Sequence, residues 1–430
     1  MKLVVAGGGG FRVPLVYDAL LGRAGLELVL HDLDGGRLER IGQVLDGLAA
    51  ERGERLPFRV TTDLDDALEG ADFVFAAIRP GGLEGRVTDE AVPLEHGVLG
   101  QETTGPGGIG FALRTIPAMV ALARAMAERA PDAWLINFTN PAGMVTEAVR
   151  PVLGDRAIGV CDSPRGLCRR VARALGRERL WFDYYGLNHL GWLGAVRDGG
   201  HDLLPGLLAD DAALESFEEG RLFGADWLRT LGAIPNEYLY YFYFTAEAVA
   251  ALRREGRGDL LRRGQDAFYA ARDGDALAAW RATRAERERT YMAEAGMERD
   301  DEPDGGGYEG EALAVVDAIA SDAGAVRILN TANRGALRCL DDAAVVEVPC
   351  VVDAAGAHPV AVGEVPAHAE ALIRAVKAVE RATIAAALSG STRLAVEALA
   401  LHPLVPSVAT ARSIFAGYRD RMPELAERFS

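Results

Sequence analysis

Short apolar runs alternate with amphipathic stretches along the first part of the chain. Lys2–Ala6, Leu26–Leu30 and Asp72–Ile78 are apolar and short, as buried strands are. Val13–Leu21 and Pro117–Arg129 have the apolar spacing of helices that pack on one face. Buried strands that alternate with helices predict a doubly wound parallel sheet.

The pattern changes after Tyr184. Up to about Cys161 the strand and helix signals alternate, whereas the later chain has longer, charged helical stretches such as Ala367–Leu388. Strand-like pieces such as Val345–Val352 interrupt these helices. We therefore predict an α/β protein with a Rossmann-like doubly wound domain followed by an α+β substrate-binding, catalytic and oligomerisation domain. The predicted domains span residues 1–183 and 184–430.

Composition narrows the class of protein. The 430 residues are 49% apolar and 25% charged, which is typical of a globular chain with sizeable cores. The formal net charge of −17 argues against nucleic acid and anionic membranes as partners. No run approaches the about 18 apolar residues of a spanning helix, and Met1–Ala6 leads directly into glycines, so we predict a cytoplasmic protein. Four cysteines are too few for a disulfide framework in this length.

Four glycines follow the first predicted strand and precede a predicted helix. Backbone N–H groups at such a turn can contact a pyrophosphate, which the helix N-terminus also favours. Asp32, at the end of the second strand, can accept hydrogen bonds from an adenosine ribose. A tight turn without a ligand is the alternative, but the strand–turn–helix–strand context favours a dinucleotide. We assign Gly7, Gly8, Gly9, Gly10, Phe11, Asp32 and Ile78 to this cofactor site.

Cys161 follows the predicted strand Ala157–Val160, and His189 comes 28 residues later. One thiolate and one imidazole would be an incomplete ligand set that substrate oxygens and water could complete around a metal. From spacing alone, a buried inert cysteine and a hydrogen-bonded histidine are the better interpretation, because free cysteines are usually buried.

Two arginines, Arg79 and Arg86, follow the third predicted strand and could hold a phosphate or carboxylate. Salt bridges to Asp89 and Glu90 are the alternative. Further along, 97–108 is glycine-rich and polar, which predicts a ligand-binding loop. The aromatic segment 235–243 predicts packing or an oligomer interface.

Taken together, several blocks resemble glycoside hydrolase family 4, most closely its 6-phospho-β-glucosidases, over nearly the whole chain. The blocks are Gln101–Gly108, Leu135–Ala148, Gly186–His189 and Val345–Pro349. The resemblance implies a C-terminal domain like that of lactate and malate dehydrogenases. It also implies hydrolysis without the usual pair of carboxylates. In that chemistry NAD⁺ oxidises sugar C3, a metal stabilises charge on the C2 and C3 oxygens, and a base removes the C2 proton. The aglycone is eliminated, water adds, and NADH returns its hydride.

The resemblance also assigns roles. It makes Cys161 and His189 the metal ligands, with Mn²⁺ as the expected ion. Tyr238 falls on the family's base, whose pKa near 10 must be lowered by a cation, and Arg257 matches a family arginine. Asp259 is expected to assist at the sugar hydroxyls. The substrate-binding residues implied are Arg79, Arg86, Asn140 and Arg257.

Two departures from the family pattern bear on specificity. Asp162 and Ser163 stand where the phospho-β-glucosidases carry asparagine and valine, and an aspartate there is the candidate general acid of the phospho-α-glucosidases. The glycine turn continues with Phe11 and Arg12 where a hydroxyl residue is usual, so a phosphate contact is changed or the substrate is unphosphorylated.

We predict a homodimeric or homotetrameric enzyme that depends on NAD and a divalent metal and hydrolyses phosphorylated disaccharides or glycosides of the 6-phospho-β-glucoside class. The alternatives within the family are the α-anomer and unphosphorylated glycosides. A malate- or lactate-type dehydrogenase is the rival from another class, and it would consume NAD⁺ stoichiometrically. A non-enzymatic nucleotide sensor is a third alternative, disfavoured by Tyr238, Cys161 and His189.

Overall fold

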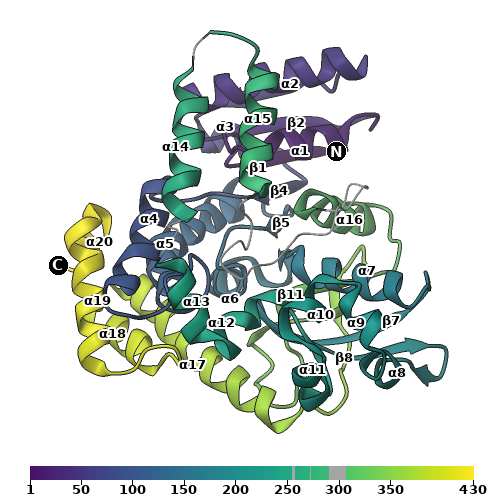
Figure 1. Cartoon of the computed structure of the whole chain (residues 1–430). Helices are drawn as coiled ribbons and strands as arrows, with labels where there is room; N and C mark the ends of the chain where they lie inside the picture. Colours follow the sequence, from purple (N-terminus) through teal and green to yellow (C-terminus); the bar gives the residue numbers. More distant parts are fainter. Residues whose placement is uncertain (254–256, 272, 290–306) are drawn as a thin grey trace.

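The structure, a computed structural model, describes residues 1–253, 257–271, 273–289 and 307–430 (Figure 1). A nine-stranded sheet forms its centre, in the order β13-β12-β11-β6-β5-β4-β1-β2-β3. The six strands from β3 to β6 pair in parallel, in the arrangement typical of dinucleotide-binding folds. These parallel strands are β1 Lys2–Ala6, β2 Glu27–His31, β3 Phe58–Thr61, β4 Phe73–Ala76, β5 Trp134–Asn137 and β6 Ala157–Gly159.

The later chain extends the same sheet with three antiparallel strands. They are β11 Ala325–Ala332, β12 Val345–Asp353 and β13 Gly356–Pro359, of which β11 pairs with β6. A second sheet contains β7 Trp181–Leu187, β8 Leu190–Asp198, β9 His201–Asp202 and β10 Ile234–Pro235. The predicted division at 183/184 falls inside β7, and it stays a prediction.

Helices cover both faces of the large sheet, as the alternation of strands and helices predicts. Successive β1 residues point to opposite faces, so that Leu3 and Val5 belong to one buried cluster and Val4 and Ala6 to the other. The first seven helices are α1 Val13–Leu20, α2 Gly35–Arg52, α3 Leu64–Leu68, α4 Gly82–Glu95, α5 Gly105–Arg129, α6 Ala142–Leu153 and α7 Ser163–Ala174, with a 3-10 turn η1 Gly154–Arg156.

The second half adds short helices around the smaller sheet and longer ones against α5 and α2 (Figure 1). The short ones are α8 Leu204–Leu208, α9 Asp211–Glu215, α10 Glu218–Phe223, α11 Ala225–Leu231, the 3-10 turn η2 Glu237–Leu239, α12 Tyr240–Tyr243 and α13 Thr245–Leu252. The others are α14 Arg257–Ala270, α15 Ala276–Arg289, α16 Tyr308–Ala320, α17 Ala367–Ser389, α18 Thr392–Leu401, α19 Val408–Arg421 and α20 Pro423–Arg428.

The glycine-rich segment 97–108 is a loop only in part, because α5 begins at Gly105. The glycines there allow close packing of the helix start. A Cβ atom on Gly107 would lie 2.1 Å from the Gln101 carbonyl oxygen, and one on Gly108 would lie 2.6 Å from the Thr103 carbonyl oxygen.

By length and composition alone, α5 could cross a membrane, but 72% of its most apolar window is buried inside the fold. This is the environment of a core helix.

Candidate active site

Most predicted site residues gather at one edge of the large sheet, where its parallel strands end. The glycine turn follows β1, Ile78 and Arg79 follow β4, Asn140 follows β5, and Cys161 follows β6. These four strands are neighbours in the sheet. The carboxyl edge of such a sheet is where ligands bind in doubly wound folds.

The glycine turn is built as a close approach between backbones. The N–H groups of Gly7 and Gly8 donate to the His31 carbonyl at 2.9 and 2.7 Å. Gly7 has φ 91°, and a Cβ atom there would lie 2.7 Å from the Ala77 carbonyl oxygen. The N–H of Gly9 donates to Asp32 at 3.1 Å, so the predicted ribose-binding carboxylate lies directly at the turn.

Phe11 and Ile78, the two other predicted cofactor-binding residues, can contact a cofactor mainly through their backbone atoms. The ring of Phe11 is only 6% exposed and packs edge-on against Phe268, so its side chain belongs to the core. The N–H of Ile78 donates to the Thr139 hydroxyl at 3.0 Å, which fixes the chain after β4.

Cys161 is buried at the end of β6. Burial raises the pKa of its thiol well above the ordinary value, and the negative charges of Glu347 and Asp162 raise it further. The group is therefore a neutral thiol unless a cation lies beside it.

His189 lies in the two-residue turn between β7 and β8, where Leu187 pairs with Leu190. Its φ of 61° lies in the left-handed region, which is costly for a residue with a side chain. The ring is buried, and its Nδ1 atom has no hydrogen-bond partner within the described chain. Burial lowers the pKa of His189 to about 4, so its imidazole is neutral at neutral pH.

Cys161 and His189 share a neighbour, because the charge of Asp162 affects the pKa of both. Among the described residues there is no group of three or more His, Cys, Asp and Glu side chains that could hold a metal. The pair therefore fits only a cation that takes its other ligands from substrate or water. A neutral imidazole with an unpartnered buried nitrogen fits that role.

A buried carboxylate that sequence reasoning did not single out supports the histidine turn. Glu347 is 0% exposed and accepts hydrogen bonds from Asn330 at 2.9 Å, Asn188 at 3.3 Å and the Tyr184 hydroxyl at 3.2 Å. Burial raises the pKa of Glu347 to about 7. Because Asn188 precedes His189, this network holds the turn that carries the predicted ligand.

A second contact connects the Cys161 segment with the predicted base. The Ser163 hydroxyl donates to Glu237 at 2.5 Å, and Glu237 is the neighbour of Tyr238. The Tyr238 ring lies flat against the His189 ring, with centroids 3.7 Å apart and planes 6° apart. Tyr238 therefore stacks on one candidate metal ligand, and its neighbour Glu237 is hydrogen-bonded to the segment that carries the other.

The two predicted phosphate-binding arginines meet at one carboxylate. Glu102 forms ion pairs with Arg79 at 2.8 Å and with Arg86 at 2.9 Å. The predicted alternative holds in part, since Arg86 also pairs with Glu90 at 2.8 Å, whereas Asp89 pairs with Arg114 instead. The sequence predicts a polar loop around Glu102, but it does not predict that Glu102 pairs with both arginines.

Arg86 is also a cation that interacts with Tyr238. Burial alone would lower the pKa of this guanidinium, but Glu102 and Glu90 raise it, and the Tyr238 phenol adds to that effect. Arg86 is therefore one cation that interacts with the predicted base, whereas the side chain of Arg257 lies outside the described residues and its role stays a prediction.

Asp259 and Asn140 are the last two predicted site residues to be placed. Asp259 is half exposed on the first turn of α14 and pairs with Arg262 at 3.2 Å. Its neighbour Gly258 donates its N–H to Glu90 at 2.8 Å, which brings this turn to the arginine cluster. Asn140 donates weakly to the Phe138 carbonyl at 3.4 Å, and its Oδ1 atom is buried without a partner in the described chain.

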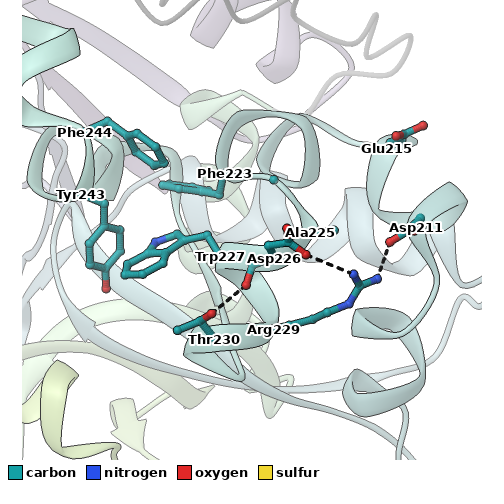
Figure 2. A pocket seen from close by; sticks show the side chains of 11 residues that line it. Asp211, Glu215, Phe223, Ala225, Asp226, Trp227, Arg229, Thr230, Tyr243 and Phe244 are labelled. Carbon is teal, nitrogen blue, oxygen red and sulfur yellow. Dashed lines mark hydrogen bonds and ion pairs between the residues drawn. The ribbon is translucent and has the colours of Figure 1, made fainter.

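A cavity of about 690 Å³ lies elsewhere and contains none of the predicted site residues. Figure 2 shows its aromatic rings on one side, with Arg229 between Asp211 and Asp226 on the other. The aromatic lining residues are Phe223, Trp227, Tyr243 and Phe244.

Fold and site together define an α/β protein with a dinucleotide-type glycine turn and a cysteine at one sheet edge, and with a histidine stacked on a tyrosine. Two family models match nearly all of the chain. One, described as family 4 glycosyl hydrolase, matches residues 2–177, and the other, described as the family 4 glycosyl hydrolase C-terminal domain, matches residues 184–405. The chain therefore belongs to glycoside hydrolase family 4, which confirms the resemblance found in the sequence.

Some relatives of the chain are named as 6-phospho-α-glucosidases and others as 6-phospho-β-glucosidases. The chain is 33% identical to 6-phospho-alpha-glucosidase 1 of Lacticaseibacillus paracasei, over 99% of this chain and 98% of the relative. A solved structure of the 6-phospho-beta glucosidase from Thermotoga maritima, with manganese, NAD⁺ and glucose-6-phosphate, is 27% identical, covers 99% of both chains and has a TM-score of 0.81.

A malate dehydrogenase from Plasmodium falciparum, at 13% identity and a TM-score of 0.54 over 90% of this chain and 98% of the other, shares the fold alone. This likeness confirms the predicted two-part architecture.

Proposed function

We propose that this chain hydrolyses glucosides phosphorylated at O6, using bound NAD⁺ and a divalent cation, with Mn²⁺ as the expected ion. The observation that carries the proposal is the stack of the neutral His189 imidazole on Tyr238, whose neighbour Glu237 accepts a hydrogen bond from Ser163. Ser163 belongs to the segment of Cys161, which lies at the same sheet edge as the glycine turn. On this proposal, a base, a two-ligand cation site and a dinucleotide turn form one active site.

The cofactors would supply chemistry that the side chains lack. When bound, NAD⁺ takes up and returns a hydride at sugar C3, and the cation stabilises charge on the neighbouring oxygens. The glycine turn and Asp32 would hold the dinucleotide, and Cys161 and His189 would hold the cation. Cys161 must lose its proton to act as a ligand, which a cation promotes.

Tyr238 is proposed to remove the proton from sugar C2. Stacking on His189 fixes its ring, and the Arg86 guanidinium interacts electrostatically with its phenol. A base held rigidly next to the cation that stabilises the developing charge is the arrangement this step requires.

Arg79 and Arg86 are proposed to bind the 6-phosphate. Their two positive charges already face the two negative charges of Glu102 and Glu90. Affinity for phosphate would therefore come from directed N–H groups on anchored guanidiniums rather than from excess positive charge.

We retain the β-anomer as the predicted substrate, with the α-anomer as second candidate. Asp162 favours the second, because this half-buried carboxylate follows Cys161 and lies close enough to His189 to affect its pKa. From there it could protonate a leaving group. Relatives of both kinds support the proposal at the level of 6-phosphoglucosides.

The test supplies the purified chain with NAD⁺, Mn²⁺, a thiol and the 4-nitrophenyl 6-phospho-β- and 6-phospho-α-glucosides in parallel. Nitrophenol is expected in large excess over NADH, because the hydride returns in each turnover. Steady accumulation of NADH without nitrophenol would overturn the proposal in favour of a dehydrogenase. The unphosphorylated glucosides serve as controls and should react far more slowly. Cytoplasmic location and a dimer or tetramer remain part of the proposal, the latter to be checked by light scattering.

A further inference from the structure

The helical hairpin of α14 and α15 lies far along the chain from the glycine turn but packs against it. Figure 1 shows both helices next to α2, and α14 also packs against α4. The packing is close, because a Cβ atom on Gly47 of α2 would lie 3.1 Å from the Leu277 Cβ of α15. Arg281 of α15 pairs with Glu51 of α2 at 2.7 Å.

Two side chains of this hairpin donate hydrogen bonds to carbonyl groups of the glycine turn. The Tyr269 hydroxyl donates to the Gly9 carbonyl at 2.8 Å, and the Trp280 indole N–H donates to the Phe11 carbonyl at 2.7 Å. The Phe11 ring packs edge-on against Phe268, with centroids 5.4 Å apart. Three aromatic residues from the second half of the chain, Phe268, Tyr269 and Trp280, therefore contact the glycine turn.

These bonds fix the direction of the backbone amides. In a trans peptide the carbonyl and the following N–H point in opposite directions. A donor on the Phe11 carbonyl therefore directs the Arg12 N–H to the other side. A donor on the Gly9 carbonyl does the same for the Gly10 N–H, which closes the turn by donating to the Gly7 carbonyl at 2.9 Å. A glycine turn has many accessible backbone conformations, so such anchors select one of them.

Tyr269 has a further contact near the predicted ribose site. The Arg37 guanidinium lies over its ring at 4.3 Å, and Gly9 donates to Asp32 at 3.1 Å. Tyr269 thus contacts both the glycine turn and Arg37 of α2.

We propose that Tyr269 and Trp280 are positioning residues of the dinucleotide site, which hold the glycine turn ready for a pyrophosphate. The inference rests on the proposed use of NAD⁺ and adds that part of the cofactor site comes from the second half of the chain. Preorganisation of this kind contributes to affinity because the turn need not be ordered on binding.

The experiment measures NADH binding by calorimetry, without metal or sugar, for Tyr269→Phe, Trp280→Phe and the unaltered chain. Each substitution removes one donor and keeps an aromatic ring. The dissociation constant is expected to rise about three- to tenfold for each, the range of one net hydrogen bond. At saturating NAD⁺, the KM for the sugar phosphate should not change.

Tyr418→Phe is the matched control, because its buried hydroxyl donates to the Pro106 carbonyl at 3.0 Å, away from the turn. Its NADH affinity should stay within about twofold of normal. Hydrogen exchange of residues 7–13 gives a second readout and should become faster in the two hairpin variants but not in the control. If a substitution lowers the melting temperature, the exchange of residues 7–13 is measured at a temperature at which that variant is still folded.

Unchanged NADH affinity and unchanged exchange in both hairpin variants would overturn the inference while leaving the proposed function intact. If the unaltered chain failed to bind NADH, the proposed function would fall, and the inference with it.

Discussion

The imidazole of His189 and the phenol of Tyr238 lie face to face, with ring centroids 3.7 Å apart and planes 6° apart. One is a predicted metal ligand and the other the predicted base. Their contact means that a change in either ring displaces the other, so substitutions must preserve the stack to be informative.

Tyr238→Phe preserves the ring and removes only the hydroxyl. We expect the variant to fold and to bind Mn²⁺, but to lose at least about 100-fold in kcat, the lower range for loss of a general base. Release of nitrophenol and entry of solvent deuterium at C2 of the product sugar measure the two expected losses. Tyr243→Phe, whose hydroxyl accepts from Trp192 at 3.0 Å, is the control in the same aromatic segment. Near-normal turnover of Tyr238→Phe would remove Tyr238 from the base role.

Cys161→Ser tests the metal assignment. Serine keeps the size of the side chain, but its hydroxyl does not ionise to an anionic ligand as a thiol does, so Mn²⁺ affinity should fall at least about tenfold. Binding is followed by electron paramagnetic resonance of free Mn²⁺, and NADH affinity should be unchanged. Cys168→Ser, a buried thiol in α7, should leave Mn²⁺ affinity as it is. Equal affinities in both variants would show that the ion lies elsewhere.

The sheet and the edge where the site lies follow from local sequence. Apolar runs such as Lys2–Ala6 and Phe73–Ala76 are strands because both faces of the sheet are covered, so every residue in them is buried or nearly so. The glycine turn and Cys161 follow such runs directly. Their position at the carboxyl edge is therefore fixed once the strands are recognised.

The supporting contacts could not be predicted in this way. Glu102 holds Arg79 and Arg86 because the start of α5 folds back against α4. Tyr269 meets Gly9 across 260 residues. Buried polar groups take whichever partner the tertiary packing brings, and no local pattern records that choice.

Arg86→Met should test how much of the arginine cluster is structural. Arg86 is 4% exposed and neutralises Glu90 and Glu102, so its loss leaves Glu90 without this ion pair and Glu102 with only one of its two arginines, Arg79. We expect the free energy of unfolding to fall by about 3–5 kcal/mol, as measured by urea denaturation. Arg79→Met, at a side chain 30% exposed, should cost about 1 kcal/mol or less. Similar losses in the two variants would contradict a structural role specific to Arg86, and adding Glu90→Gln to Arg86→Met should restore part of the stability.

A buried histidine outside the proposed chemistry predicts how stability depends on pH. His402 is 5% exposed and accepts a hydrogen bond from the Leu404 N–H at 3.1 Å. Burial lowers its pKa from 6.5 to about 4. Above pH 6.5 the ring is neutral in both the folded and the unfolded chain, so it causes no pH dependence. Between pH 6.5 and 4 the unfolded chain binds a proton that the folded chain excludes, and stability falls by up to about 3 kcal/mol.

His402→Asn keeps an acceptor for the Leu404 N–H and removes the titration. Packing loss should lower the melting temperature of the variant at pH 8, but the further decrease between pH 7 and pH 5 should be smaller than in the unaltered chain. Other groups that titrate in this range are present in both proteins, so the difference between the two curves isolates His402. Melting followed by circular dichroism at several pH values gives these curves, and parallel curves would mean that the excluded proton is not at His402.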